Sequence, residues 1–234
     1  MRKLAILLSC LFAVLVVQAQ DEPEYRMEIG AGVGAMTYQG DFSGSLVKNV
    51  QPAAGLVWRY LFNPRNALRV QGTYGKLKGN SDNSETWYPD YTGTDVTQRA
   101  HYDFTSTVVD VSVVYEYNFL PYGTGRDYFR AKRFTPFVFI GLGATNAKPS
   151  NGDSNMSLSF PFGLGIKYKM GTRANLSVAW GMHFTTGDQL DGVKDPYGIT
   201  SSGLFKNTDS FSLLMVSLTY SFKAKCRTCN NDHF

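Results

Sequence analysis

The sequence has few of the residues on which enzymes and metalloproteins commonly depend. It contains three cysteines and three histidines in 234 residues, and its formal net charge is only +4. There is no block of Lys and Arg, so a nucleic-acid partner is not expected. Beyond the first twenty residues no run of about 18 apolar residues occurs, which excludes a transmembrane helix. The sequence gives no reason to expect a cofactor or a metal.

The first residues have the pattern of a secretory signal peptide. Arg2 and Lys3 precede an apolar run from Leu4 to Val17, and Val17-Gln18-Ala19 provides a small-residue cleavage site. Cys10 allows the alternative of a lipid anchor, but apolar residues continue well past it. We therefore expect residues 1–19 to be removed.

The clearest pattern lies between Ser157 and Phe184. Large apolar residues alternate there with small or charged ones in two stretches, separated by Gly171-Thr172-Arg173. Side chains alternate between the two faces of a strand, so this pattern predicts a hairpin with one apolar face. Strands of soluble proteins usually have about five or six residues. These stretches are as long as the ~9–11 residues that a tilted strand needs to cross a bilayer.

The opposite face of this hairpin carries glycines together with Lys167 and Lys169. Glycine is a poor choice for a water-exposed strand face, but it suits the crowded polar interior of a membrane barrel. The same alternation recurs along the chain and predicts eight strands. Their expected ranges are Tyr25–Tyr38, Val50–Phe62, Leu68–Leu77, His101–Phe119, Phe134–Thr145, Ser157–Met170, Leu176–Phe184 and Phe211–Phe222.

Charged residues well inside these strands all fall on the face without large apolar residues. Because an eight-stranded barrel has room only for its own side chains, they predict a packed network of ion pairs rather than a conducting pore. The predicted lumen network consists of Glu28, Arg59, Arg69, Asp110, Glu116 and Lys167.

Aromatic residues on the apolar face gather at one end of the strands, as in the interfacial girdle of an outer-membrane barrel. The connectors at this end are mostly short, and those at the other end are mostly long and polar. This asymmetry predicts that the end with the girdle faces the periplasm. The predicted girdle consists of Tyr25, Tyr60, Phe62, Tyr117, Phe119, Phe134, Tyr168, Tyr220 and Phe222.

Two other functions remain open from the residues. His183 and Thr185 share the inward face and Asp188 follows, so a barrel that modifies lipid by acid–base chemistry is one alternative. The simpler interpretation of His183 is a lumen side chain bonded to a neighbour. A small pore, or a binding barrel that uses its long outer loops, is the second alternative.

A basic surface is predicted at the periplasmic end. It combines the longest connector on that side with a cysteine-bearing tail, where Cys226 and Cys229 fit a small structural disulfide in an oxidising compartment. We expect this surface to dock a periplasmic protein. Its residues are Arg126, Arg130, Lys132, Arg133, Lys225, Cys226, Arg227 and Cys229.

Several short segments resemble a family of Bacteroidetes outer-membrane barrels that includes the type IX secretion component PorG. They are Tyr38-Gln39-Gly40-Asp41-Phe42, Trp58-Arg59-Tyr60, Ala67-Leu68-Arg69, Thr73-Tyr74-Gly75, Asp188 to Val193, and Leu218 to Phe222 with Cys226 soon after. The resemblance implies an outer-membrane barrel without enzymatic activity. It also implies contact with a periplasmic secretion ring made of a lipoprotein and a partner protein.

The sequence therefore predicts an all-β protein, an eight-stranded antiparallel up-and-down transmembrane β-barrel in the outer membrane. We expect a signal peptide at 1–19, the barrel at 20–222 and a periplasmic tail at 223–234. Outer-membrane lipid and periplasmic ring proteins are the expected partners. The expected role is that of a non-enzymatic structural or assembly component in protein secretion.

Overall fold

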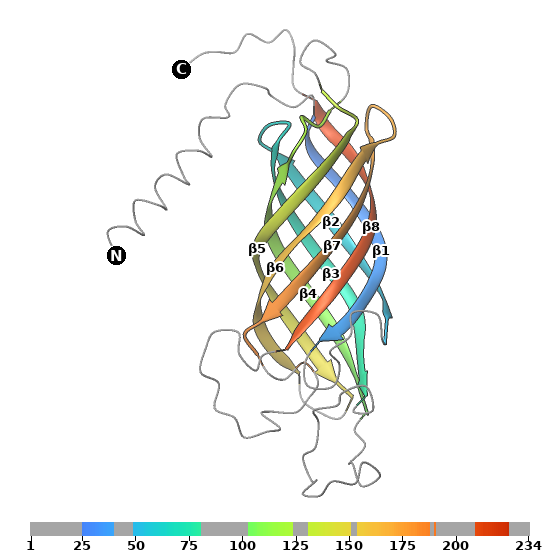
Figure 1. Cartoon of the computed structure of the whole chain (residues 1–234), viewed down its shortest axis with the longest axis vertical. Coiled ribbons are helices and arrows are strands. Elements are labelled where there is room, and N and C mark those ends of the chain that lie inside the picture. The colour runs from blue at the N-terminus through green and yellow to red at the C-terminus, as the bar shows by residue number, and fades with distance from the viewer. Residues whose placement is uncertain are drawn as a thin grey trace, which may run out of the picture.

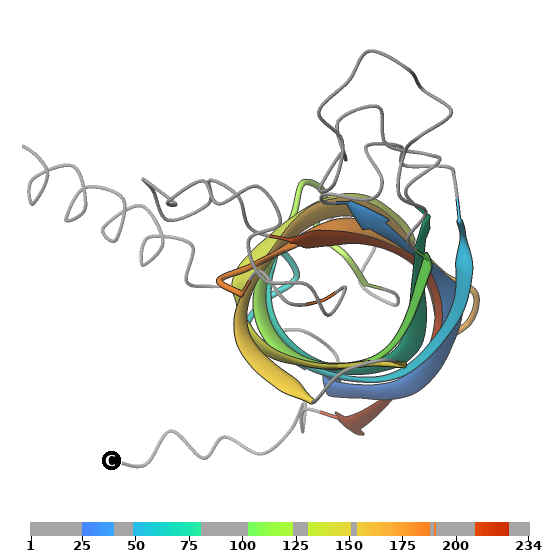
Figure 2. The same ribbon diagram turned by 90° about the horizontal axis from the view of Figure 1, so that it is seen from below.

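The computed structural model describes residues 25–39, 49–80, 103–123, 131–150, 154–187, 190 and 209–224. They form a barrel in which each strand pairs antiparallel with the next and β8 pairs with β1 (Figure 1). Seen end-on, the sheet closes into a ring (Figure 2). The predicted eight-stranded antiparallel transmembrane barrel is confirmed. Within the described ranges, no helix is long and apolar enough to span a membrane.

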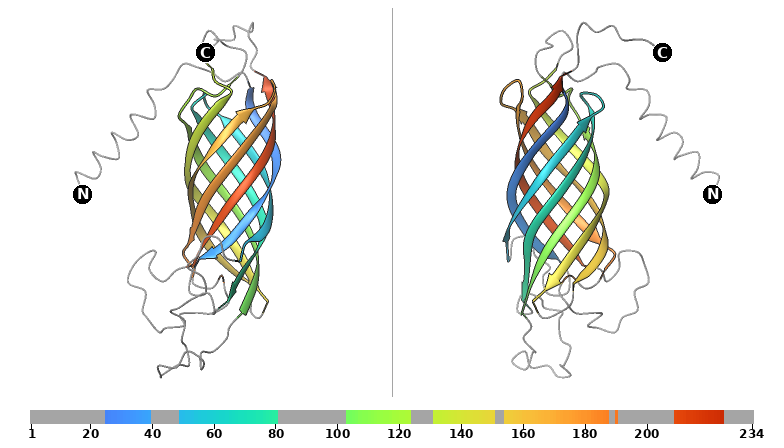
Figure 3. Two further views of the ribbon diagram at one scale, coloured as in Figure 1. Left: turned by 45° about the vertical axis from the view of Figure 1, so that its right-hand side comes forward. Right: turned by 180° about the vertical axis from the view of Figure 1, so that it is seen from behind.

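All eight strands are long and run along the barrel wall, strongly tilted from the barrel axis (Figure 3). Ladders of nine to 15 residue pairs give each strand backbone partners on both sides, which a strand in lipid requires. The strands are β1 Tyr25–Gln39, β2 Gln51–Leu61, β3 Asn66–Asn80, β4 Asp103–Asn118, β5 Phe134–Pro149, β6 Asn155–Lys169, β7 Ala174–Thr185 and β8 Ser210–Ala224.

The strand ends differ from the sequence prediction where polar residues continue a ladder. β3 extends to Asn80, which pairs with Asp103, and β5 extends to Pro149. Alternation of apolar residues does not mark these ends, because a neighbouring strand pairs with polar residues equally well. β8 ends at Ala224, so the barrel extends two residues into the predicted tail. The predicted signal peptide lies outside the described residues.

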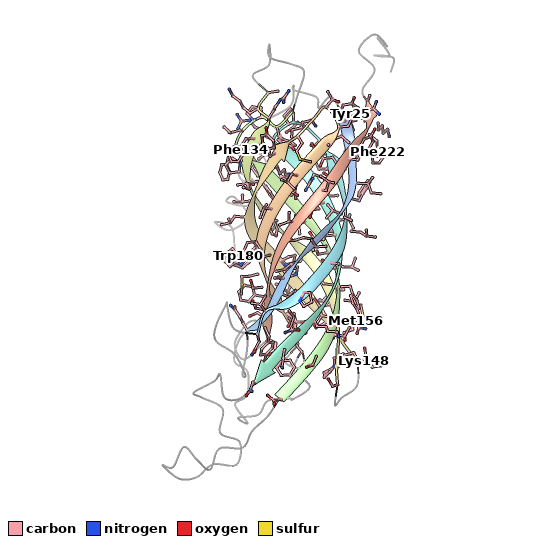
Figure 4. The ribbon with its side chains drawn as sticks, turned by 90° about the vertical axis from the view of Figure 1, so that its right-hand side faces the viewer. Tyr25, Phe134, Lys148, Met156, Trp180 and Phe222 are labelled. Carbon is pink, nitrogen blue, oxygen red and sulfur yellow. The ribbon has the colours of Figure 1, made fainter. Side chains whose placement is uncertain are left out.

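The outer surface of the barrel is apolar. Leu56, Val33 and Ile140 are 70%, 68% and 66% exposed, values that a soluble protein would rarely show for such side chains on every strand. Tyr25, Phe134 and Phe222 lie toward the same end of the barrel (Figure 4). An apolar belt with an aromatic girdle, around a polar interior, is the pattern of outer-membrane-type barrels.

The interior is packed where aromatic residues of β5 meet glycines of β6 and β7. A β-carbon on Gly181 would lie 2.7 Å from Cζ of Phe139, and one on Gly163 would lie equally close to that atom but only 2.2 Å from the backbone oxygen of Trp180. Glycine at position 181 therefore makes room for the ring, and glycine at position 163 also allows the close approach of the β7 backbone. Phe137 and Phe139 point inward, which explains why β5 carries large apolar residues on both faces.

Candidate functional site

A cluster of buried charges fills the barrel near the end where β1 begins and β8 finishes. Glu116 lies at its centre, with its Oε2 atom 2.8 Å from Nε of Arg59. Lys167 also binds Glu116, and its Nζ lies 3.0 Å from Oδ1 of Asn118. Arg59 contacts Glu28 as well, so it bridges both carboxylates. These buried charges thereby link β1, β2, β4 and β6 across the interior, where lipid and water do not reach.

Arg69 completes this cluster with a weaker geometry. Its Nε atom lies 3.2 Å from Oε1 of Glu116. The angle does not suit a hydrogen bond, and Nε has no hydrogen-bond partner within the described residues. The guanidinium instead lies over the ring of Phe139, with Cζ 4.5 Å from the ring centroid. Lys167 lies over Phe137 in the same way, at 4.3 Å. The two inward rings therefore compensate for the excess of cations by cation–π contact.

Asp110 is not part of this cluster, which corrects the predicted six-residue network. Its Oδ2 atom accepts hydrogen bonds from Thr145 Oγ1 at 2.8 Å and Ser159 Oγ at 3.0 Å. Asp110 lies six residues from Glu116 on β4, which is about 20 Å along a strand. Both carboxylates face inward, but the length of the strand places them in different layers.

His183 lies beside Asp110 in this second layer. Its Nδ1 atom is 3.5 Å from Oδ1 of Asp110, and its ring stacks on Phe211 with centroids 4.5 Å apart. The side chain is buried, and the cavity next to it has a volume of about 10 Å³, which holds at most one water. Ser159 donates to Asp110 rather than to His183. Among the described residues, the space beside His183 is therefore too small for a lipid, and Ser159 does not donate to the imidazole.

An apolar plug closes the interior beyond His183, toward the end where β1 finishes and β8 begins. Tyr38 packs edge-on against Phe104, with centroids 4.9 Å apart, and donates a hydrogen bond to Oδ1 of Asp209. The other oxygen of Asp209 accepts from the backbone N–H of Leu190. The plug consists of Met36, Tyr38, Ala53, Leu77, Phe104, Val108, Ala147, Leu190, Phe211, Leu213 and Met215.

The described residues of the connector after β4 reach into the opposite mouth of the barrel. Tyr122 is buried there, and its hydroxyl donates to Oδ1 of Asn175 at 3.0 Å. Its backbone N–H donates to the carbonyl of Pro64, and Gly123 donates to the carbonyl of Lys132. Burial, with the charge of Glu28 adding to it, raises the pKa of Tyr122 above its ordinary value. The interior is thus occupied from a tyrosine cap, through charges and rings, to an apolar plug.

The mouth capped by Tyr122 presents a basic surface. Lys132, Arg133 and Arg173 are exposed there. Within the described ranges, the carboxylates on this side of the barrel are Glu28 and Glu116, and both are buried. Of the predicted docking residues, only Lys132 and Arg133 are described. Arg126, Arg130, Lys225, Cys226, Arg227 and Cys229 lie outside the described residues.

The long loops that the pore and binding alternative would use, and Asp188, also lie outside the described residues. Within the described part of the chain, no group of three or more His, Cys, Asp and Glu is placed to hold a metal ion.

A comparison with protein families gives one result that covers nearly the whole chain. The model described as "Domain of unknown function (DUF6089)" matches residues 2–231. The chain belongs to this family. No curated protein matches the sequence of this DUF6089 barrel.

Solved structures similar to this DUF6089 barrel include two small barrels. Ail, the attachment invasion locus protein of Yersinia pestis, is 14% identical, with a TM-score of 0.46 over 85% of this chain and 99% of that one. Neisserial surface protein A is 16% identical, with a TM-score of 0.46 over 84% of this chain and 97% of that one. The closed antiparallel register from β1 to β8 establishes the fold of this chain.

Two side-chain contacts of this DUF6089 barrel were not predicted from the sequence. Tyr122 lies in a connector whose composition gives no sign that one ring turns inward. Arg173 was predicted only as part of a turn, but its Nη1 donates to Tyr220 Oη at 2.8 Å and its Nε to Tyr25 Oη at 3.3 Å. These hydrogen bonds raise the pKa of Arg173 further above its ordinary value. An arginine at the level of the aromatic girdle was the available signal.

Proposed function

We propose that this DUF6089 barrel is a non-enzymatic component of the outer membrane that docks periplasmic proteins of a secretion machine. The observation that carries the proposal is the combination of a filled interior with a basic, capped mouth. A barrel filled with its own side chains offers no path for a solute, so its two ends and its outer surface remain for interaction. The capped end presents exposed cations without an exposed carboxylate among the described residues.

The secretion role is supported by the resemblance to the PorG-like family, whose members meet a periplasmic ring of lipoprotein and partner protein. A basic surface fits an acidic partner, since complementary charge steers and orients association. The backbone of Lys132 is bonded to the segment that holds Tyr122 in the mouth, because its N–H donates to the carbonyl of Pro121 at 2.7 Å. These backbone hydrogen bonds hold Lys132 and the adjacent Arg133 at the mouth, where they are available for docking.

Charge reversal tests the proposal. The tagged chain is extracted in mild detergent, and bound proteins are identified by mass spectrometry for the intact chain and for Lys132→Glu with Arg133→Glu. A matched control reverses two exposed cations at the other end of the barrel, Lys76→Glu with Lys148→Glu. Recovery of periplasmic ring proteins by the intact chain and the control, with loss in the first variant, supports docking at the capped mouth.

Two outcomes would contradict the proposal. If the intact chain recovers no periplasmic ring protein, the secretion role is wrong. If recovery is the same for both double variants, the docking surface lies elsewhere. Removal of residues 225–234 separates the contribution of the tail from that of Lys132 and Arg133.

A further inference from the structure

Three exposed lysines lie on the outer face of the barrel at the end opposite Tyr122. Lys76 of β3 pairs in register with Thr107 of β4, and Thr107 pairs with Lys148 of β5. Lys78 lies two residues farther along β3 on the same face. Figure 4 places Lys148 toward the end opposite Tyr25 and Phe222. The lysines therefore border the apolar belt on the side away from the girdle.

The spacing of these cations suits a phosphorylated headgroup. Strands lie about 4.8 Å apart, so the backbones of Lys76 and Lys148 are separated by roughly 10 Å, and their flexible side chains can converge above Thr107. Within the described residues, none of the three lysines forms an ion pair. The nearest exposed carboxylate in the register is Asp103, which pairs with Asn80 at the very end of the ladder. Clustered cations next to a membrane attract anionic lipid headgroups.

A hollow opens in the apolar belt on the same side of the barrel. The β5–β6 ladder pairs Ile140 with Phe162 and Gly143 with Ser159, but the two positions between them are unpaired. Pro161 falls in this gap and has no N–H to donate. The hollow has a volume of about 610 Å³ and an almost wholly apolar lining. It is lined by Ile140, Gly141, Leu142, Phe160, Pro161, Phe162 and Phe184.

The distance between hollow and lysines matches one lipid leaflet. Leu142 and Lys148 lie on the same face of β5, six residues apart, which is about 20 Å along a strand. At the usual tilt of about 45° this path rises about 14 Å along the membrane normal. Half of a ~30 Å hydrocarbon core is about 15 Å. A lipid whose phosphate lies at the lysines can therefore place the end of an acyl chain in the hollow.

We propose that this surface is a binding site for lipopolysaccharide. Lys76 and Lys148 bind a phosphate of its lipid A headgroup, Lys78 supports them, and one acyl chain occupies the hollow over the β5–β6 gap. Lipopolysaccharide is the phosphorylated lipid of the outer leaflet, and the predicted topology places this end of the barrel there. The inference rests on that orientation and not on periplasmic docking, since the two sites lie at opposite ends.

The first experiment measures binding of deep-rough lipopolysaccharide to the full chain in detergent by native mass spectrometry. The variant Lys76→Gln with Lys148→Gln is compared with Lys132→Gln with Arg133→Gln, which removes two charges at the other end. Each lysine near an anionic surface contributes about 1 kcal/mol, so we expect the first variant to weaken binding on the order of thirtyfold. The second variant should bind as the intact chain does. Equal binding by both variants overturns the site.

Two further comparisons test which lipid binds and where its acyl chain lies. Dephosphorylated lipid A should bind as weakly as lipopolysaccharide binds the lysine variant, whereas equal binding of phosphatidylglycerol and lipopolysaccharide overturns the assignment to lipopolysaccharide. Leu142→Trp fills the hollow and should weaken binding several-fold. Leu164→Trp, at an exposed position of the same belt outside the hollow, serves as the control. An identical effect of both tryptophans overturns the placement of the chain. Heat-modifiable gel mobility verifies that each variant is folded.

Discussion

Nδ1 of His183 faces Oδ1 of Asp110 at 3.5 Å in the barrel interior, and neither atom has a hydrogen-bond partner within the described residues. Asp110 is held from its other oxygen by two hydroxyls, and His183 is held by the ring of Phe211. Each side chain is therefore fixed by groups other than its neighbour. This arrangement is typical of a packed interior.

Replacement of His183 tests that conclusion. His183→Ala removes the stack on Phe211 and leaves Asp110 buried without its neighbour, so we expect a loss of about 1–3 kcal/mol in the free energy of unfolding. Urea titration in lipid vesicles measures this loss. Lipid A and phospholipid profiles of cells that express the variant should be unchanged. A lipid species that disappears with His183 would instead establish a lipid-modifying enzyme.

Removal of the central carboxylate should destabilise the charge cluster strongly. Glu116→Gln leaves Arg59, Arg69 and Lys167 with only Glu28, and breaking a buried ion pair from one side costs about 3–5 kcal/mol. Adding Lys167→Met removes one of the uncompensated cations. The double variant should therefore be more stable than Glu116→Gln alone, as measured by urea unfolding. Additive losses would show that Glu116 and Lys167 do not interact.

The contact between Phe139 and Gly181 predicts a packing defect. Gly181→Ala places a methyl group against the ring, and overpacking of this kind costs about 1–3 kcal/mol. Gly72→Ala is the matched control, because a β-carbon there meets no atom within 4 Å. Phe139→Leu should relieve part of the cost of Gly181→Ala. If Gly181→Ala and Gly72→Ala unfold at the same urea concentration, the ring does not fill this space.

The buried phenol of Tyr122 predicts a dependence of stability on alkaline pH. Its folded pKa lies above the unfolded value, which is about 10 for tyrosine. The neutral phenol therefore contributes fully to stability below pH 10, and this contribution is lost as pH rises toward the folded pKa. The slope is at most about 1.4 kcal/mol per pH unit. Tyr122→Phe keeps the ring but cannot ionise, so the difference in unfolding free energy between the two proteins should shift above pH 10 and stay constant below it.

The occupied interior predicts the absence of channel activity. The intact chain, reconstituted in planar bilayers, should give no stepwise current where a porin added to the same bilayer does. Unitary steps that scale with the amount of folded barrel would contradict the plug formed by residues such as Phe211 and the cap formed by Tyr122.

The sequence by itself determined the central parts of the strands and the side on which their residues lie. Period-two alternation assigned Arg59, Glu116 and Lys167 to the interior and Leu56 or Val33 to the lipid, because the pleat leaves no other choice. Strand ends such as Asn80 and Pro149 escaped prediction, since polar residues near the membrane surface pair without any apolar signal.

Only the tertiary structure decided which inward residues meet. The period of a strand fixes the face of a side chain but not its height in the barrel, which depends on the stagger of eight ladders. That stagger brings Glu28 and Glu116 to Arg59 and takes Asp110 to His183. It also brings Tyr122 of a connector to Asn175, and aligns Lys76 with Lys148 across β4. The contacting pairs are separated by 31 to 73 residues, and Lys76 and Lys148 are joined only through an intervening strand, so no local pattern in the sequence records them.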